Sequence, residues 1–241
     1  MQDQLTLRDA AHLLHLSTQE VVKLAESGGL PGLKRAGKWE FNRRAVLDHV
    51  AAEIPTMPVD RLAGLERGLS GHGAVGSAAP TAELMVVPLL AREGIELTLP
   101  ARTKGSVLAE LVGIAERTEL VWDRPALLDA VRRREDVCST AVDGGIAIPH
   151  PRRTPEHSLG ESLVVFARSP GGVPFGALDR RLTDLFFLVA CTDEHIHLRV
   201  LARLCRLLRD PELPDALRSA ESPDEVLEML TRAEETELRA R

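Results

Sequence analysis

A histidine between two prolines is the residue of this chain best suited to nucleophilic chemistry. His150 follows the apolar run Ile146–Ile148 and lies between Pro149 and Pro151. Pro149 fixes its own φ angle and Pro151 disfavours the α region for His150, so the imidazole is carried on a stiff backbone. A neutral imidazole nitrogen is a good nucleophile near pH 7. Phosphoryl transfer depends mainly on positioning and charge stabilisation, so a rigidly held histidine is suited to it; the alternative is a surface-turn histidine.

The residues before His150 form a longer motif. Ser139–His150 reads STAVDGGIAIPH, which resembles the signature S-T-x-x-x-x-G-I-A-I-P-H of phosphotransferase system enzyme IIA domains of the fructose, mannitol and nitrogen-regulatory class. The resemblance covers about residues 84–237, and it implies a phosphohistidine carrier within a phosphotransferase rather than a stand-alone enzyme. Three further segments resemble the same family: GVPFGA at Gly172–Ala177, DLFFL at Asp184–Leu188 and HLRVLARL at His197–Leu204.

The resemblance implies a role for each of three residues. His150 accepts the phosphoryl group from a phosphocarrier protein, and His197 lies beside it and steadies the phosphate with a hydrogen bond. Arg134 holds phosphate oxygens with its forked, permanently charged guanidinium. His195 competes with His197 for the second role, although the leucines that follow His197 favour His197. The alternative for Arg134 is a solvated helix end in the run 132–134.

The composition excludes several classes of protein. A net charge of −6, 3% aromatic residues and no Tyr argue against a chain that binds nucleic acid throughout. No apolar run approaches the roughly 18 residues that span a bilayer, and the N-terminus lacks a secretory pattern, so we expect a cytoplasmic protein without a membrane span. Three scattered cysteines are too few for a disulfide framework. His150, His195 and His197 lack the spacing of a metal site, and we expect neither metal nor cofactor.

Residues 84–237 alternate strand-like and helical patterns, which predicts an α/β domain with helices flanking a mixed sheet, as the resemblance also implies. The apolar run LFFLVA within 184–190 predicts a central strand that is covered on both faces. The expected helices are 104–117, 124–134, 193–209, 211–220 and 223–236. The expected strands are 96–99, 141–148, 162–167 and 184–190.

Residues 1–54 predict a small, mainly α, winged-helix-like domain. Two short helices precede a hairpin that turns at Ala36-Gly37, and a third helix follows over 43–53. Residues 55–83 are rich in Gly and Pro and predict a flexible linker with a short helix at 59–67. The expected helix caps are Thr6 or Asp9, Ser17 with Glu20 in a capping box, and Asn42.

The same 54 residues resemble the excisionase and MerR-type helix-turn-helix family over almost all of 4–51. The start of the second helix can enter the major groove of DNA. From Lys34 to Arg44 there are five basic residues and one acidic residue, a net of 5 − 1 = +4 that can neutralise backbone phosphates. The alternative is a solvated surface on a module that binds protein. The residues expected to contact DNA are Thr18, Gln19, Lys23, Lys34, Arg35, Lys38 and Arg43.

The fusion of the two predicted domains indicates a regulator. Phosphorylation of His150 would report cellular energy or nitrogen supply and would control binding of double-stranded DNA or of a protein target. If the amino-terminal domain binds DNA, we expect it to dimerise, because paired half-sites give such modules useful affinity. Two alternatives remain: a plain phosphocarrier whose amino-terminal module binds protein, and a non-catalytic scaffold that keeps the fold without taking phosphate.

Overall fold

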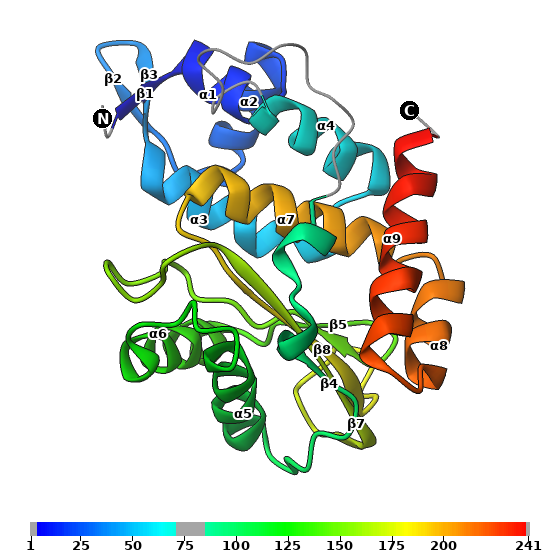
Figure 1. The fold of residues 1–241 in the computed structure, drawn as a ribbon. Helices are drawn as coiled ribbons and strands as arrows, with labels where there is room; N and C mark the ends of the chain where they lie inside the picture. Colours follow the sequence, from blue (N-terminus) through cyan, green and yellow to red (C-terminus); the bar gives the residue numbers. More distant parts are fainter. Residues whose placement is uncertain (1–3, 71–84, 240–241) are drawn as a thin grey trace. The chain divides into compact units, whose positions relative to one another are not determined.

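The chain divides into two compact units, Met1–Pro80 with Glu194–Arg206 and Thr81–Asp193 with Leu207–Arg241. The computed structural model describes residues 4–70 and 85–239 (Figure 1). His150 lies in the second unit and His197 lies in the first. No helix in these described ranges is both long and apolar enough to cross a membrane.

Short helices and a three-stranded antiparallel sheet of order β1-β3-β2 make up the first unit (Figure 1). The predicted helices and hairpin are confirmed, whereas strand β1 was not expected. The elements are β1 (Gln4–Thr6), α1 (Leu7–Leu13), α2 (Thr18–Glu26), β2 (Leu33–Arg35), β3 (Lys38–Asn42), α3 (Arg43–Glu53), η1 (Ile54–Thr56), α4 (Val59–Ser70) and most of α7 (Glu194–Leu207).

Side-chain caps begin α1, α2 and α3 at the positions that the sequence predicted. The Thr6 hydroxyl accepts the Asp9 N–H at 3.3 Å, and the Asp9 carboxylate accepts the Thr6 N–H at 2.9 Å. Ser17 and Glu20 form the same reciprocal box, with distances of 3.3 and 2.8 Å. These hydrogen bonds hold the pKa of each carboxylate below its usual value. Thr6 is therefore the cap of α1 and Asp9 its return partner.

The short helix predicted at 59–67 within the linker is present as α4, which continues to Ser70. Helix α4 carries the buried carboxylate of Glu66, which pairs with two arginines of α7 in the same unit. Arg203 Nε lies 2.8 Å from one Glu66 oxygen, and an Arg206 guanidinium nitrogen lies 2.8 Å from the other. A carboxylate survives such burial only with charged partners, so the triad ties α4 to α7. Residues 71–83 of the predicted linker lie outside the described residues. Three leucines of α4 are also buried: Leu62, Leu65 and Leu69.

A five-stranded mixed sheet of order β4-β7-β8-β6-β5 is the centre of the second unit. Strands β7 and β8 are antiparallel, whereas β6 runs parallel to β8 and β4 runs parallel to β7. The predicted α/β class with a mixed sheet is confirmed. The elements are η2 (Val87–Leu89), η3 (Arg92–Gly94), β4 (Ile95–Glu96), α5 (Lys104–Glu116), α6 (Arg124–Val137), β5 (Ala141–Val142), β6 (Ile146–Ala147), β7 (Leu163–Val173), β8 (Thr183–Ala190), α8 (Glu212–Ser219) and α9 (Pro223–Arg239).

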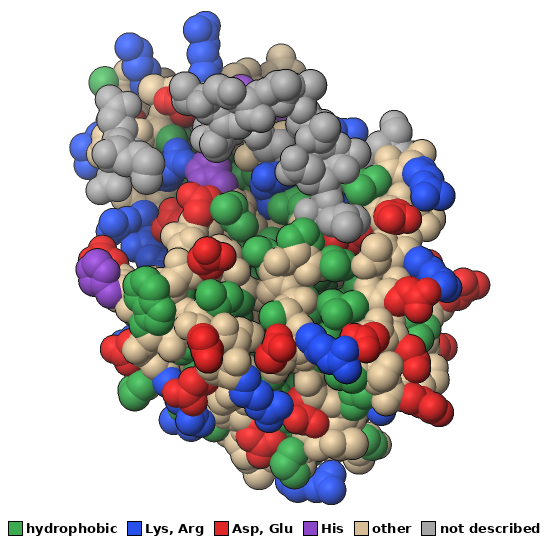
Figure 2. Space-filling model, in the orientation of Figure 1, with side chains coloured by type: hydrophobic (Ala, Val, Ile, Leu, Met, Phe, Trp, Pro, Cys, Tyr) green, Lys and Arg blue, Asp and Glu red, His purple; other side chains and the backbone are tan. Residues whose placement is uncertain are grey.

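Helices α5 and α6 pack on one face of this sheet (Figure 1). Val165 of β7 and Leu188 of β8 belong to one buried cluster with Leu111 of α5 and Val131 of α6. Strand β8 lies between β7 and β6 and is buried along almost its whole length, as the unbroken apolar run predicted. Over the surface of this unit that Figure 2 shows, acidic and basic side chains are interspersed.

The segment 141–148, predicted as one strand, is a hairpin. Gly144 and Gly145 have φ angles of +85° and +80°, a region that favours glycine, and they reverse the chain between β5 and β6. The Gly145 carbonyl accepts the Asp184 N–H at 2.8 Å, and Arg218 donates to the Gly144 carbonyl. The turn therefore sets the register of β6 against β8 and, with it, the place where His150 leaves the sheet.

Candidate functional site

His150 leaves the sheet directly beyond β6, in a segment that is pinned on both sides. The Val189 N–H of β8 donates to the Pro149 carbonyl at 3.0 Å. On the other side, the Ile148 N–H donates to the Thr140 carbonyl at 3.1 Å. The backbone that carries the imidazole is thus fixed by the two prolines and by hydrogen bonds to both neighbouring segments.

A hydrogen bond also fixes the protonation pattern of the His150 ring. Nδ1 lies 2.7 Å from the Ile148 carbonyl oxygen. Because a carbonyl oxygen can only accept, Nδ1 carries the proton in the neutral ring and Nε2 carries the lone pair. The hydrogen bond therefore distinguishes the two ring nitrogens, with the proton on Nδ1 and the lone pair on Nε2.

Arg134 lies in the last turn of α6 and reaches the segment that leads to the β5–β6 hairpin. Its guanidinium donates to the Cys138 carbonyl at 3.0 Å and approaches the Cys138 sulfur at 3.5 Å. Arg132 and Arg133 are exposed, whereas Arg134 is buried. The alternative of a solvated helix end therefore fits Arg132 and Arg133 better than it fits Arg134.

A buried carboxylate that the sequence did not single out lies next to Arg134. Glu135 is only 3% exposed, and one of its oxygens accepts both the Thr140 N–H at 3.0 Å and the Thr140 hydroxyl at 2.6 Å. The other oxygen pairs with Lys104 Nζ at 2.9 Å. A signal for this burial was present, because Leu127, Val131 and Glu135 recur at four-residue spacing and share one face of the helix.

The two candidate histidines of α7 have different surroundings within the first unit. His197 is buried, whereas His195 is partly exposed and its Nε2 accepts a hydrogen bond from the Arg43 guanidinium. Since His197 and His150 belong to different compact units, the role of His197 beside the phosphate stays a prediction.

Most of the side chains predicted to contact DNA are exposed. Arg43 is the exception, because it is half-buried and bonded to His195. On the hairpin, Lys34 Nζ lies 5.7 Å from the centre of the Trp39 ring, an arrangement that stiffens the hairpin without removing the charge. The exposed candidates are Thr18, Gln19 and Lys23 on α2, and Lys34, Arg35 and Lys38 on the hairpin.

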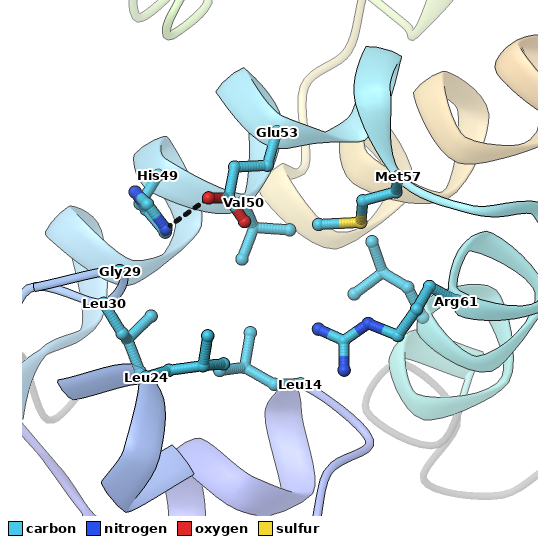
Figure 3. Close-up of a pocket in the computed structure, with 10 residues that line it drawn as sticks. Leu14, Leu24, Gly29, Leu30, His49, Val50, Glu53, Met57 and Arg61 are labelled. Carbon is cyan, nitrogen blue, oxygen red and sulfur yellow. Dashed lines mark ion pairs between the residues drawn. The ribbon is translucent and has the colours of Figure 1, made fainter. Parts of the chain in front are cut away.

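The first unit also contains a small pocket with an apolar floor (Figure 3). It comprises about 330 Å³ of space, part of it open to solvent, and it is lined by Leu24 of α2, Leu65 of α4 and Leu14, which directly follows α1. The His49–Glu53 pair, 3.1 Å apart, lies at its wall, and the Arg61 side chain extends toward its middle (Figure 3).

Other chemistries find little support in the described residues. No group of three or more His, Cys, Asp or Glu side chains within 4–70 and 85–239 is arranged to hold a metal ion. Burial raises the pKa of the Cys191 thiol to about 12, so this cysteine stays protonated and unreactive near neutral pH.

Comparison with known proteins relates residues 88–233 to one family. The family model "Phosphoenolpyruvate-dependent sugar phosphotransferase system, EIIA 2" matches residues 88–233. The "PTS system fructose-specific EIIABC component" of Bacillus subtilis is 32% identical over 149 residues, 61% of this chain but only 23% of that protein. The "PTS system fructose-specific EIIA component" of Haloferax volcanii is 35% identical over 140 residues, 57% of this chain and 89% of that protein. The crystal structure of the nitrogen regulatory protein IIA-Ntr from Neisseria meningitidis superposes with a TM-score of 0.55 at 25% identity, covering 60% of this chain and 97% of that one.

Proposed function

We propose that Nε2 of His150 accepts a phosphoryl group from a phosphocarrier protein. The chain belongs to the EIIA 2 family of the phosphoenolpyruvate-dependent sugar phosphotransferase system, which supports this proposal. The observation that carries this proposal is the 2.7 Å hydrogen bond from Nδ1 to the Ile148 carbonyl. It places the ring proton on Nδ1 and the lone pair on Nε2.

The transfer is a simple displacement at phosphorus. The Nε2 lone pair forms the new N–P bond while the bond from phosphorus to the carrier breaks and its electron pair returns to the carrier. The ring then carries a positive charge shared between both nitrogens, and the Ile148 carbonyl stabilises the Nδ1–H that bears part of it. In the reverse direction the same charged ring is a good leaving group, so the phosphoryl group can be passed to an acceptor protein.

Two further residues are proposed to act on the phosphoryl group. The Arg134 guanidinium is proposed to bind phosphate oxygens, for which its permanent charge and planar fork are suited. His197 is proposed to donate a hydrogen bond to the same group. His195 is the weaker candidate, because its Nε2 already accepts a hydrogen bond from Arg43.

The amino-terminal unit is proposed to be a helix-turn-helix module of the excisionase and MerR type that contacts double-stranded DNA. The capped start of α2 and the exposed, basic β2–β3 hairpin support this proposal. The whole chain would then be a cytoplasmic regulator, dimeric on DNA, in which the phosphoryl group on His150 controls a DNA or protein target. The alternative is a module that binds protein, and absence of DNA retention at low salt would favour it.

Intact mass spectrometry tests the phosphoryl-acceptor function. The purified chain is incubated with phosphoenolpyruvate, enzyme I and a phosphocarrier protein, and we expect an acid-labile gain of one phosphoryl group. His150→Ala should abolish the gain, whereas His157→Ala, which removes an exposed histidine outside the site, should leave it unchanged. No gain with several carrier proteins would favour the scaffold alternative.

A further inference from the structure

An unbroken series of polar contacts connects a buried ion pair to the imidazole of His150. Lys104 pairs with Glu135 at 2.9 Å, and Glu135 accepts the Thr140 N–H and hydroxyl at 3.0 and 2.6 Å. The Thr140 carbonyl accepts the Ile148 N–H at 3.1 Å, and the Ile148 carbonyl accepts the Nδ1–H of His150 at 2.7 Å. Each contact lies within the second compact unit.

The carboxylate of Glu135 determines where the Thr140 backbone lies. Both donors of Thr140 converge on the same carboxylate oxygen, which fixes this residue in position and in rotation. Moving Thr140 away would leave the buried Glu135 carboxylate without its hydrogen-bond donors. Because an unsatisfied buried charge is costly, the arrangement resists distortion. Lys104 is only partly exposed and supplies the balancing charge.

The neighbouring arginine holds the other end of the same short segment. Arg134 donates to the Cys138 carbonyl, two residues before Thr140. Adjacent residues of α6 therefore clamp 138–140 from both ends, and this segment in turn positions the strand that ends at His150. A static clamp of this kind reduces the movement of the ring relative to an incoming phosphorus atom.

We propose that Glu135 is a positioning residue for phosphoryl transfer. Through Thr140 and Ile148 it holds the carbonyl that keeps the proton of His150 on Nδ1 and the lone pair on Nε2. This inference rests on the proposed phosphoryl-acceptor function, but its structural part concerns the ring tautomer and is measurable without any transfer. Glu135 itself does not contact the reacting atoms.

The test uses the full chain and four variants. In Glu135→Gln an amide replaces the carboxylate, so an NH₂ group must face either Lys104 or the donors of Thr140, and one contact is lost in either orientation. Thr140→Val removes the hydroxyl donor at nearly constant volume, whereas Thr140→Ser retains it. Asp136→Asn is the matched control, because it neutralises the adjacent exposed carboxylate.

Two readouts separate positioning from general stability. The first is the His150 tautomer, observed through ring ¹⁵N and ¹H resonances at a pH where the ring is neutral. The second is the rate of phosphorylation by a phosphorylated carrier protein. We expect Glu135→Gln and Thr140→Val to introduce the Nε2–H tautomer and to slow transfer about ten- to a hundred-fold. Thr140→Ser and Asp136→Asn should keep the wild-type tautomer and transfer rate within about two-fold.

The outcomes distinguish the two proposals. If Glu135→Gln and Thr140→Val keep the Nδ1–H tautomer and the wild-type rate, the positioning role is wrong while the acceptor function stands. If the wild-type chain takes no phosphate, the acceptor function fails, and the tautomer measurement still decides whether Glu135 orients the ring. Should Glu135→Gln fail to fold, the contrast between Thr140→Val and Thr140→Ser decides in its place.

Discussion

At the residue scale, the proposed chemistry depends on the ring tautomer of His150 and on the oxygen acceptors around the Arg134 guanidinium. The proposed nucleophilic role of His150 depends on the Ile148 carbonyl, which accepts the Nδ1 proton and leaves the lone pair on Nε2. Arg134 combines burial with a permanent charge, which is costly unless the guanidinium is satisfied by oxygen acceptors. A phosphate would supply such acceptors in addition to the Cys138 carbonyl that Arg134 already contacts.

The alkaline limit of stability should depend on Cys191. Burial raises the pKa of this thiol from 9.0 to about 12, so above pH 9 the unfolded chain loses a proton that the folded chain retains. Stability that is present below pH 9 is therefore lost as the pH rises toward 12. Between pH 9 and 10, urea unfolding should show wild type losing about 1 kcal/mol relative to Cys191→Ala. A difference between the two proteins that stays constant over this range would contradict the assignment, and Cys138→Ala, at an exposed thiol, serves as the control.

The sequence singled out His150 as the proposed phosphoryl acceptor but did not single out the buried residues that hold its backbone. His150 was predictable because its two prolines and the preceding apolar run are contiguous. Glu135 was missed although it continues the four-residue spacing of Leu127 and Val131, because a glutamate in a run of charged residues at a helix end usually faces solvent. Its burial depends on Lys104, which comes from another helix, and such a pairing is decided by the packing of α5 on α6.

At the element scale, the β5–β6 hairpin controls the position of His150. It reverses the chain through two left-handed glycines, and its turn is held by Asp184 and Arg218. A single strand over 141–148 was the wrong prediction, because both glycines were read as ordinary strand residues. Two consecutive glycines are a sequence signal for a turn, but the apolar residues on either side of them favoured the prediction of a continuous strand.

The two glycines of this turn provide a matched pair of substitutions. A Cβ on Gly145 would lie 2.9 Å from an Asp184 carboxylate oxygen and 3.1 Å from the Leu182 carbonyl, whereas a Cβ on Gly144 would meet no atom within 4 Å. Gly144→Ala should therefore cost only the strain of its positive φ, about 1 kcal/mol. We expect Gly145→Ala to cost about 2–3 kcal/mol, because it adds close contacts to the same strain. Chemical denaturation measures both values, and equal losses would show that the close contacts are unimportant.

Elements with local signals were predicted well, and those that depend on distant partners were not. The Ser17–Glu20 box and the Asn42 cap were visible because each involves residues three apart. Strand β1 was missed because it has three residues and pairs with β3, so that Gln4 lies opposite Asn42. The short strand carries only one buried side chain, Leu5, which gives no periodic pattern to detect.

At the scale of the whole molecule, helix α7 belongs to a different compact unit from the sequence segments on either side of it. Its residues resemble part of the enzyme IIA motif, yet Glu194–Arg206 belong to the compact unit that contains the amino-terminal helices. The buried ion pairs of Glu66 with Arg203 and Arg206 bind α7 to α4, which explains why α7 belongs to this unit. The same helix carries His197, so the histidine proposed to hydrogen-bond the phosphoryl group lies on an element of the compact unit that contains the amino-terminal helices.

The basic hairpin should govern DNA affinity if the amino-terminal unit binds DNA. Replacing both Lys34 and Lys38 with Ala should weaken binding to duplex DNA at low salt and reduce the slope of log affinity against log salt by about 2, since two phosphate contacts are lost. Arg67→Ala, which removes an exposed charge on α4, is the control and should change neither quantity. Affinity that is independent of Lys34 and Lys38 would favour the protein-binding alternative. Equal affinity with and without phosphate on His150 would argue against regulation of DNA binding by the phosphoryl group.

The most direct test of the central claim is to locate the phosphoryl group on the ring. The chain is labelled with ¹⁵N-histidine, phosphorylated by its carrier, and examined by ³¹P and ¹⁵N NMR at alkaline pH, where phosphohistidine persists. We predict one phosphohistidine, at His150, with phosphorus bonded to Nε2 and the proton retained on Nδ1 against the Ile148 carbonyl. Phosphorus on Nδ1, or on any residue other than His150, would contradict the account.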